Sequence, residues 1–230
     1  DIAAVYTQAP KRSKRGQKIN FSPVHLYSEE LNLDVRYPEN LNNDKEIQFF
    51  KRIKPDVVIV VAYGKILPKK ILDLKNIKFL NVHASLLPKW RGAAPIQRSI
   101  INMDKETGIS IMKILPKLDS GPVMLQDKLK ITNDDDFISL SKKLSILGSK
   151  LLLDSLNLIE KKSHKFIDQD EHSATYAKKI DKKEAIADWN MTAEQMIAKI
   201  KGLNPSPGVW FMHKSARIKI IRALETNHKG

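Results

Sequence analysis

The sequence contains no cysteine, and this absence excludes disulfide bonds and thiolate metal sites. Its six histidines, at positions 25, 83, 164, 172, 213 and 228, show no H-x-x-x-H spacing, so we expect no metal. No apolar run approaches the roughly 20 residues that a membrane-spanning helix requires, and the amino-terminal residues lack a signal-peptide pattern. We therefore expect a soluble protein of a reducing cytoplasm, without a membrane partner.

Glycine-rich phosphate-binding motifs are also missing. Neither G-x-G-x-x-G nor G-x-x-x-x-G-K-[ST] occurs, so no dinucleotide fingerprint or P-loop is visible. Ser85 lacks the flanking residues of a nucleophile elbow. These absences give no support to a dehydrogenase, a P-loop nucleotide hydrolase or a serine hydrolase.

Positive charge is abundant. Forty Lys and Arg against 26 Asp and Glu give a net charge of +14, which attracts polyanions such as RNA, although lysines spread over a solvated surface would give the same total. The charge is concentrated in one place: Lys11, Arg12, Lys14, Arg15 and Lys18 crowd into eight residues without apolar periodicity. This segment is predicted to be a mobile, electropositive loop.

Apolar runs alternate with amphipathic stretches, as is typical of an α/β protein. Strands are predicted at residues 2–6, 57–62, 79–81, 108–115 and 123–131, and helices at 42–53, 69–74, 93–102 and 135–159. Residues 21–26 are expected to carry the chain onward to a short edge segment. The polar residues 161–184 are predicted to be a linker, and a second domain is expected over 185–230, with a helix capped by Thr192 and Gln195.

Asn81 and His83 follow the apolar run at 79–80, and Asp119 comes 36 residues after His83 in D-S-G-P. Ligands of open α/β sheets bind beyond the carboxyl ends of the strands, where Asn81 and His83 are expected. An amide, an imidazole and a carboxylate can together transfer an acyl group to an amine. The alternative for each is structural: Asn81 would satisfy a turn beside a half-buried His83, and Asp119 would cap its own turn.

Longer motifs surround these residues. The run N-V-H-A-S-L-L-P-K-W-R-G-A-A-P-I-Q-R covers 81–98, T-G-I-S-I-M covers 107–112, L-D-S-G-P-V-M-L-Q covers 118–126, and N-P-S-P-G-V-W covers 204–210. Together they resemble the methionyl-tRNA formyltransferase family. N-x-H, S-L-L-P and D-x-G are shared by the wider group of 10-formyltetrahydrofolate-dependent formyltransferases. The narrower resemblance depends on W-R-G-A-A-P-I-Q-R, on the basic segment and on N-P-S-P-G-V-W.

The resemblance implies a Rossmann-like, mostly parallel α/β domain over residues 1–160, without the family's first strand and helix. After the linker at 161–184, it implies the start of a tRNA-binding β-barrel over 185–230, which is truncated. The implied reaction is transfer of the formyl group of 10-formyltetrahydrofolate to the methionine amino group of initiator methionyl-tRNA, for translation initiation. It would take place in a bacterial cytosol or its organelle equivalent, and the protein is expected to be a monomer.

Site residues follow from the same resemblance. Asn81 and a protonated His83 would stabilise the oxyanion, and Asp119 would hold His83 and move the amine proton. The loop Ser85, Leu86, Leu87 and Pro88 would bind the folate. The basic residues Lys11, Arg12, Lys14, Arg15 and Lys18 would contact the acceptor arm of the tRNA.

Two other functions fit part of the pattern. A formyltransferase for a small amine, such as a sugar nucleotide or glycinamide ribonucleotide, would keep N-x-H and D-x-G but need neither the basic segment nor a second domain. A non-catalytic RNA-binding protein would fit the charge alone. The sequence also leaves open whether Arg91 and Arg98 bind acidic ligand groups or form internal ion pairs.

Overall fold

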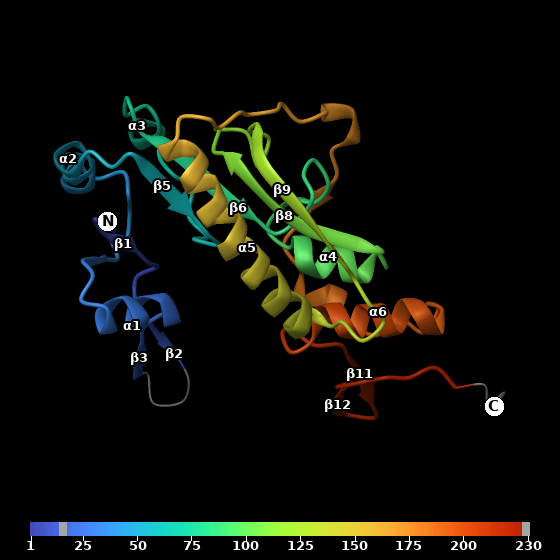
Figure 1. Cartoon of the computed structure of the whole chain (residues 1–230). Coiled ribbons are helices and arrows are strands. Elements are labelled where there is room, and N and C mark those ends of the chain that lie inside the picture. Colours follow the sequence, from blue (N-terminus) through green and yellow to red (C-terminus); the bar gives the residue numbers. More distant parts are fainter. Residues whose placement is uncertain (14–17, 227–230) are drawn as a thin grey trace. The chain divides into compact units, whose positions relative to one another are not determined.

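The computed structural model describes residues 1–13 and 18–226 of the chain (Figure 1). Its contacts divide the chain into two compact units, residues 1–80 and residues 81–230. Strand β6 (Lys78–His83) carries the chain from the first unit into the second. Among the described helices, none is long and apolar enough to cross a membrane.

The first unit alternates short strands with helices, as expected for an α/β protein. β1 pairs with β4 in parallel, and β2 pairs with β3 in antiparallel orientation. Its elements are β1 (Val5–Tyr6), β2 (Lys11–Ser13), β3 (Lys18–Asn20), α1 (Pro23–Glu30), β4 (Val35–Arg36), α2 (Asp44–Ile53), β5 (Val57–Val60) and α3 (Lys69–Leu72).

Helix α1 lies where residues 21–26 were expected only to carry the chain to a short edge segment, and no helix was predicted there. Ser22 caps this helix, because its hydroxyl accepts a hydrogen bond from the His25 amide at 3.1 Å. Pro23 occupies the first helical position, where its missing N–H has no consequence. The buried residues of α1 are His25 and Ser28 rather than an apolar stripe, so helical periodicity gives little signal here.

Helix α2 begins and ends close to its predicted bounds. The Asn43 side chain accepts from the Glu46 amide at 2.9 Å and caps the amino-terminal end. At the other end, Lys54 takes the left-handed conformation with φ 45°, and Pro55 cannot continue the helix. The face that α2 buries includes Ile47, Phe49 and Phe50.

The second unit is built around strands β8 and β9, which are antiparallel neighbours. Hydrogen bonding gives the strand order β5-β6-β8-β9. After β6, the elements of this unit are β7 (Arg91–Gly92), α4 (Pro95–Ile101), β8 (Glu106–Lys113), β9 (Val123–Lys130), α5 (Phe137–Glu160), β10 (Tyr176–Ala177), α6 (Ala193–Leu203), β11 (Trp210–His213), β12 (Ala216–Lys219) and the 3₁₀ turns η1 (Glu171–Ser173) and η2 (Lys182–Ala185).

Helix α5 packs against β8 and β9 (Figure 1). Asp136 and Ser139 form a capping box at its start, and Leu140, Leu144 and Leu151 are buried along one face, as the periodicity predicts. Burying each of these leucines contributes about 1.5–3 kcal/mol. Gly148 allows the close packing, since a Cβ there would lie 3.3 Å from Cγ1 of Val82.

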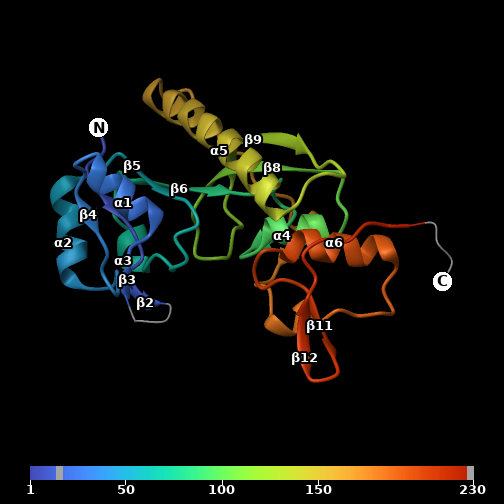
Figure 2. The same ribbon diagram turned by 90° about the horizontal axis from the view of Figure 1, so that it is seen from below.

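In the carboxyl-terminal part of this unit, helix α6 begins as predicted at the capping box of Thr192 and Gln195. Helix α6 packs against α4, and β11 and β12 form an antiparallel hairpin (Figures 1 and 2). A small apolar core joins these elements, formed by Ala185, Ala187, Ile200, Leu203 and Val209. The predicted barrel and the predicted domain boundaries remain predictions.

The segment predicted to be a linker, residues 161–184, makes specific contacts within the second unit. Its strand β10 pairs in parallel with β7, so that Tyr176 lies opposite Arg91 and Ala177 opposite Gly92. Gly92 has φ +123°, and a Cβ there would lie 2.8 Å from the carbonyl oxygen of Ala177. Glycine is therefore required for this close approach.

Candidate active site

The three predicted catalytic residues lie together in the second unit. The Asn81 Nδ2 atom is 3.5 Å from Oδ1 of Asp119, and the His83 Nδ1 atom is 3.6 Å from Oδ2 of the same carboxylate. The side chain of His83 is only 6% exposed and that of Asp119 17%. An amide, an imidazole and a carboxylate thus meet in a mostly buried place, where electrostatic interactions are stronger than in water.

Strand geometry explains why Asn81 and His83 share one face. Both belong to the last residues of β6, and residues two apart in a strand point to the same side. Asp119 comes from the connection between β8 and β9, where its φ is 43°. For a residue other than glycine, such a left-handed conformation costs about 1–3 kcal/mol, and surrounding contacts must maintain it.

Contacts of this kind involve the backbone of two glycines, Gly92 of the W-R-G motif and Gly121 of D-S-G-P. The Gly92 amide donates to Oδ2 of Asp119 at 2.9 Å. Gly121 lies so close to the carbonyl of Lys113 that a Cβ would be 1.8 Å from that oxygen. The glycine of D-S-G-P is therefore needed for the loop to close.

Both ring nitrogens of His83 face oxygen acceptors. Nε2 is 2.9 Å from the carbonyl oxygen of Trp90, and Nδ1 faces the Asp119 carboxylate. Because a carbonyl oxygen can only accept, Nε2 is the donor in the first contact. The distance of 3.6 Å between Nδ1 and the Asp119 carboxylate leaves Nδ1 free of a hydrogen bond within the part of the protein that the structure describes.

The loop Ser85–Pro88 is fixed by internal hydrogen bonds. Ser85 is completely buried and donates to the carbonyl of Lys89, while Ser110 donates to the carbonyl of Ser85, each at 2.6 Å. The Leu87 amide donates to Ser110 Oγ at 3.1 Å. Leu86 and Pro88 are half-buried, and Leu87 is buried. A rigid apolar wall of this kind suits a flat ring system.

The basic segment is only partly described. Lys11 and Arg12 belong to β2 and Lys18 to β3, and Ser13 pairs with Lys18. Lys14 and Arg15 lie outside the described residues. The predicted irregular loop therefore has a two-stranded base, and its role with tRNA stays a prediction.

Arg91 and Arg98, which the sequence left open, both form internal ion pairs. Arg91 is completely buried and donates to both carboxylate oxygens of Glu171, at 2.9 and 3.2 Å. Arg98 donates in the same way to Glu184, at 2.5 and 3.0 Å. The hydrogen bonds from Arg91 and then from Lys117 lower the pKa of Glu171 to about 2.

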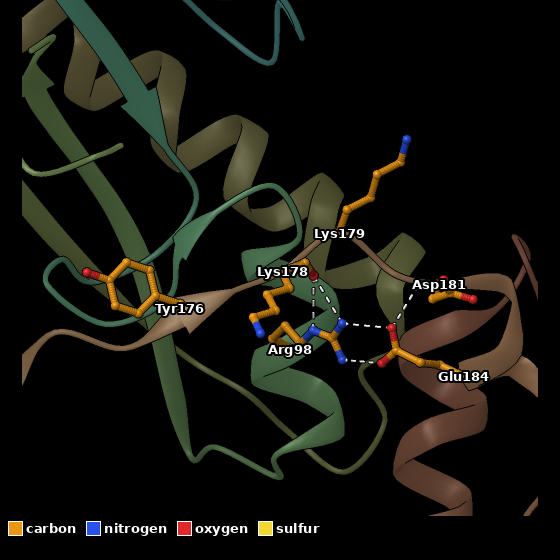
Figure 3. Close-up of a pocket in the computed structure, with 6 residues that line it drawn as sticks. All are labelled: Arg98, Tyr176, Lys178, Lys179, Asp181 and Glu184. Atoms are coloured by element: carbon orange, nitrogen blue, oxygen red, sulfur yellow. Dashed lines mark hydrogen bonds and ion pairs between the residues drawn. The ribbon is translucent and has the colours of Figure 1, made fainter. Parts of the chain in front are cut away.

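The Arg98–Glu184 pair belongs to a pocket of about 460 Å³ (Figure 3). Its lining residues are Arg98, Tyr176, Lys178, Lys179, Asp181 and Glu184. Figure 3 shows the ammonium group of Lys179 directed away from the ion pair. None of the three predicted catalytic residues lines this pocket, so it is a separate feature. Across residues 1–13 and 18–226, the structure brings together no group of three or more His, Asp or Glu that could hold a metal ion.

Two residues that no sequence pattern indicates are Gln169 and Glu171, which contact Arg91 and the loop 114–122 that carries Asp119. Gln169 donates to the carbonyl oxygens of Asp119 and Gly121, at 2.9 and 2.6 Å. Both residues come from the segment without periodicity, and their partners are 48 to 80 positions away in the sequence. No local pattern could have found such contacts.

Comparisons with known proteins agree with the α/β fold of the chain. The amino-terminal formyl transferase model matches residues 1–156, and the formyl transferase carboxyl-terminal domain model matches residues 179–230. The chain belongs to the formyl transferase family.

One relative of known sequence and two solved structures illustrate the similarity. The methionyl-tRNA formyltransferase of Pelagibacter ubique (strain HTCC1062) is 52% identical over 230 residues, which covers all of this chain and 74% of that protein. The solved structure of methionyl-tRNA formyltransferase from Clostridium thermocellum has a TM-score of 0.66 at 20% identity, covering 89% of this chain and 88% of that one. HypX from Aquifex aeolicus in complex with tetrahydrofolic acid has a TM-score of 0.71 at 16% identity, covering 96% of this chain and 38% of that chain. Both solved structures share the fold of this chain.

Proposed function

We propose that this protein transfers the formyl group of 10-formyltetrahydrofolate to the methionine amino group of initiator methionyl-tRNA. The observation that carries the proposal is the 52% identity to a methionyl-tRNA formyltransferase over the whole chain. The matched stretch covers the whole chain, including the region of the carboxyl-terminal family domain and the basic segment, which a small-amine formyltransferase would not need. A net charge of +14 suits a polyanionic substrate.

Asn81, His83 and Asp119 are proposed to carry the chemistry. The methionine amine attacks the formyl carbon, and the carbonyl oxygen becomes an oxyanion. The Asn81 amide and the His83 Nδ1–H would donate to that oxygen, since Nε2 of His83 is already bonded to Trp90. Losing one such donor costs about 2.7–4 kcal/mol of barrier.

Asp119 is proposed to move the proton. It accepts the proton that the attacking amine loses, and the bond between the formyl carbon and N10 then breaks. The proton passes to N10, directly or through water, so that tetrahydrofolate leaves neutral at that nitrogen. The contact at 3.6 Å between Asp119 and His83 also lets the carboxylate stabilise the charged imidazole.

Substrate binding would use other residues. The folate would lie against Ser85, Leu86, Leu87 and Pro88, and the tRNA acceptor arm would contact the basic segment Lys11, Arg12, Lys14, Arg15 and Lys18. The tetrahydrofolic acid bound by HypX, a protein of similar fold, supports a folate-type donor. We propose a monomeric cytosolic enzyme that uses no metal.

The test is formyl transfer by the purified protein from 10-formyltetrahydrofolate to methionine-charged initiator tRNA. Free methionine and an amino-sugar nucleotide serve as competing acceptors. Formylation of the charged tRNA alone is the expected result. Formylation of the sugar nucleotide, with none of the tRNA, would replace the proposal by the small-amine alternative.

A further inference from the structure

Gln169 connects the loop of Asp119 to a buried arginine. Its Nε2 atom donates to the carbonyls of Asp119 and Gly121, and its Oε1 atom accepts from Nε of Arg91 at 3.0 Å. We infer that Gln169, held by Arg91, is a positioning residue that sets the Asp119 carboxylate for proton transfer. The inference rests on the proposed function.

The hydrogen bonds define the orientation of the Gln169 amide. Arg91 can only donate, so the atom facing it is the amide oxygen. The two backbone carbonyls can only accept, so the atom facing them is the amide nitrogen with its two hydrogens. A reversed amide would place oxygen against two oxygens. Every hydrogen-bonding group of the side chain is thus used, in one orientation.

Arg91, which holds the Gln169 amide, is itself fixed by its surroundings. It is completely buried, and its guanidinium forms two bonds to Glu171, which also accepts from Lys117 at 2.6 Å. Lys117 belongs to the same loop as Asp119. The loop is therefore attached twice to the segment 169–171, through Lys117 and through the carbonyls of Asp119 and Gly121.

The left-handed backbone of Asp119 explains why such attachment matters. A residue other than glycine leaves φ 43° readily unless its surroundings hold it there. Rotation at this residue would carry the carboxylate away from the Gly92 amide, which lies 2.9 Å from Oδ2. It would also change the 3.6 Å contact with His83. Gln169 acts on the carboxylate through the backbone, without touching the substrate.

Two substitutions test the inference. Gln169→Leu removes all three hydrogen bonds of this side chain, whereas Gln169→Glu keeps an acceptor for Arg91 and removes both donors to the loop. We expect both variants to lower kcat about 10- to 100-fold, as a misplacement of about 1 Å can do, and to leave the KM for charged tRNA nearly unchanged. The pH profile of kcat/KM should shift as well. A Gln169→Glu variant with unaltered kcat and pH profile would overturn the inference.

A double substitution separates this inference from the proposed function. If Gln169 acts through Asp119, adding Gln169→Leu to Asp119→Asn causes little further loss, because the group it positions is already gone. If the rate losses of the two single substitutions multiply in the double variant, the positioning role is overturned. Full activity of Asp119→Asn alone would instead refute the proposed role of Asp119. If Gln169→Leu does not fold, the same double-mutant cycle with Asp119→Asn is measured with Gln169→Glu, and the same two outcomes apply.

Asp135→Asn is the matched control for a purely structural effect. Asp135 is 3% exposed and, like Gln169, satisfies several partners, among them Thr132, Ser139 and Lys143, at the start of α5. This variant should unfold at a lower temperature with kcat and pH profile unchanged. Gln169 variants that behave in the same way would show a structural role only, and the inference would fail.

Discussion

Replacing Asp119 by asparagine tests the proposed chemistry with little change in shape. The asparagine can still accept from the Gly92 amide, so the loop should keep its conformation. It loses the negative charge that faces Nδ1 of His83 at 3.6 Å and the ability to take a proton. The loss of a positioned base lowers the rate by about 10²–10⁴. At about 1.36 kcal/mol per tenfold, this corresponds to about 2.7–5.4 kcal/mol of barrier.

The assay is single-turnover formyl transfer to methionine-charged initiator tRNA with saturating 10-formyltetrahydrofolate. Equilibrium binding of the charged tRNA, measured in parallel, should stay close to that of the unchanged protein, because the proposed phosphate contacts lie on other residues. Thermal unfolding should change little. A normal transfer rate would refute the role of Asp119, and equal losses of rate and tRNA binding would refute the separation of chemistry from RNA contacts.

Three further predictions address other parts of the chain. Reversing the charges over residues 11–18 should weaken tRNA binding and reduce its salt dependence while leaving folate binding unchanged; equal binding at physiological salt would exclude the segment as an RNA contact. The pKa of Glu171 is lowered from 4.5 to about 2, chiefly by the hydrogen bond from Arg91, so its contribution to stability is present above pH 4.5 and is lost as the pH falls to about 2. The difference in Tm between the native protein and Glu171→Gln should therefore shrink over that range, and a constant difference would contradict this. Thr192→Ala should destabilise the protein by about 0.5–2 kcal/mol in urea unfolding through loss of the α6 cap with Gln195, without changing kcat.

Local signals in the sequence were sufficient for much of the fold. The capping residues Asn43 and Thr192 mark helix starts, and Pro55 marks a helix end, because caps and breakers act on their immediate neighbours. The apolar stripe of α5 likewise needed no knowledge of its partner strands. Helix α1 was missed because it buries polar residues, although the sequence Ser22-Pro23 is itself a start signal.

The candidate site was predictable in part. Asn81 and His83 share a strand face by their spacing alone, whereas the position of Asp119 beside them depended on the resemblance to a family. The ion pairs of Arg91 and Arg98 could not be read from the sequence, since Glu171 and Glu184 are 80 and 86 positions away. Such contacts depend on the path of a segment that shows no periodicity.

The attachment of the Asp119 loop to residues 169–171 affects how this protein can be divided. The region that matches the amino-terminal family model, residues 1–156, contains Asn81, His83 and Asp119 but neither Gln169 nor Glu171. A fragment cut at that boundary would carry every proposed reacting group, yet its Asp119 loop would lack both attachments. The inactivity of such a fragment would therefore not reveal a need for the carboxyl-terminal domain that matches residues 179–230. A fragment cut after Ala177 would keep Gln169, Glu171 and the pairing of Ala177 with Gly92. Its activity would therefore distinguish loss of the loop attachments from loss of the carboxyl-terminal domain.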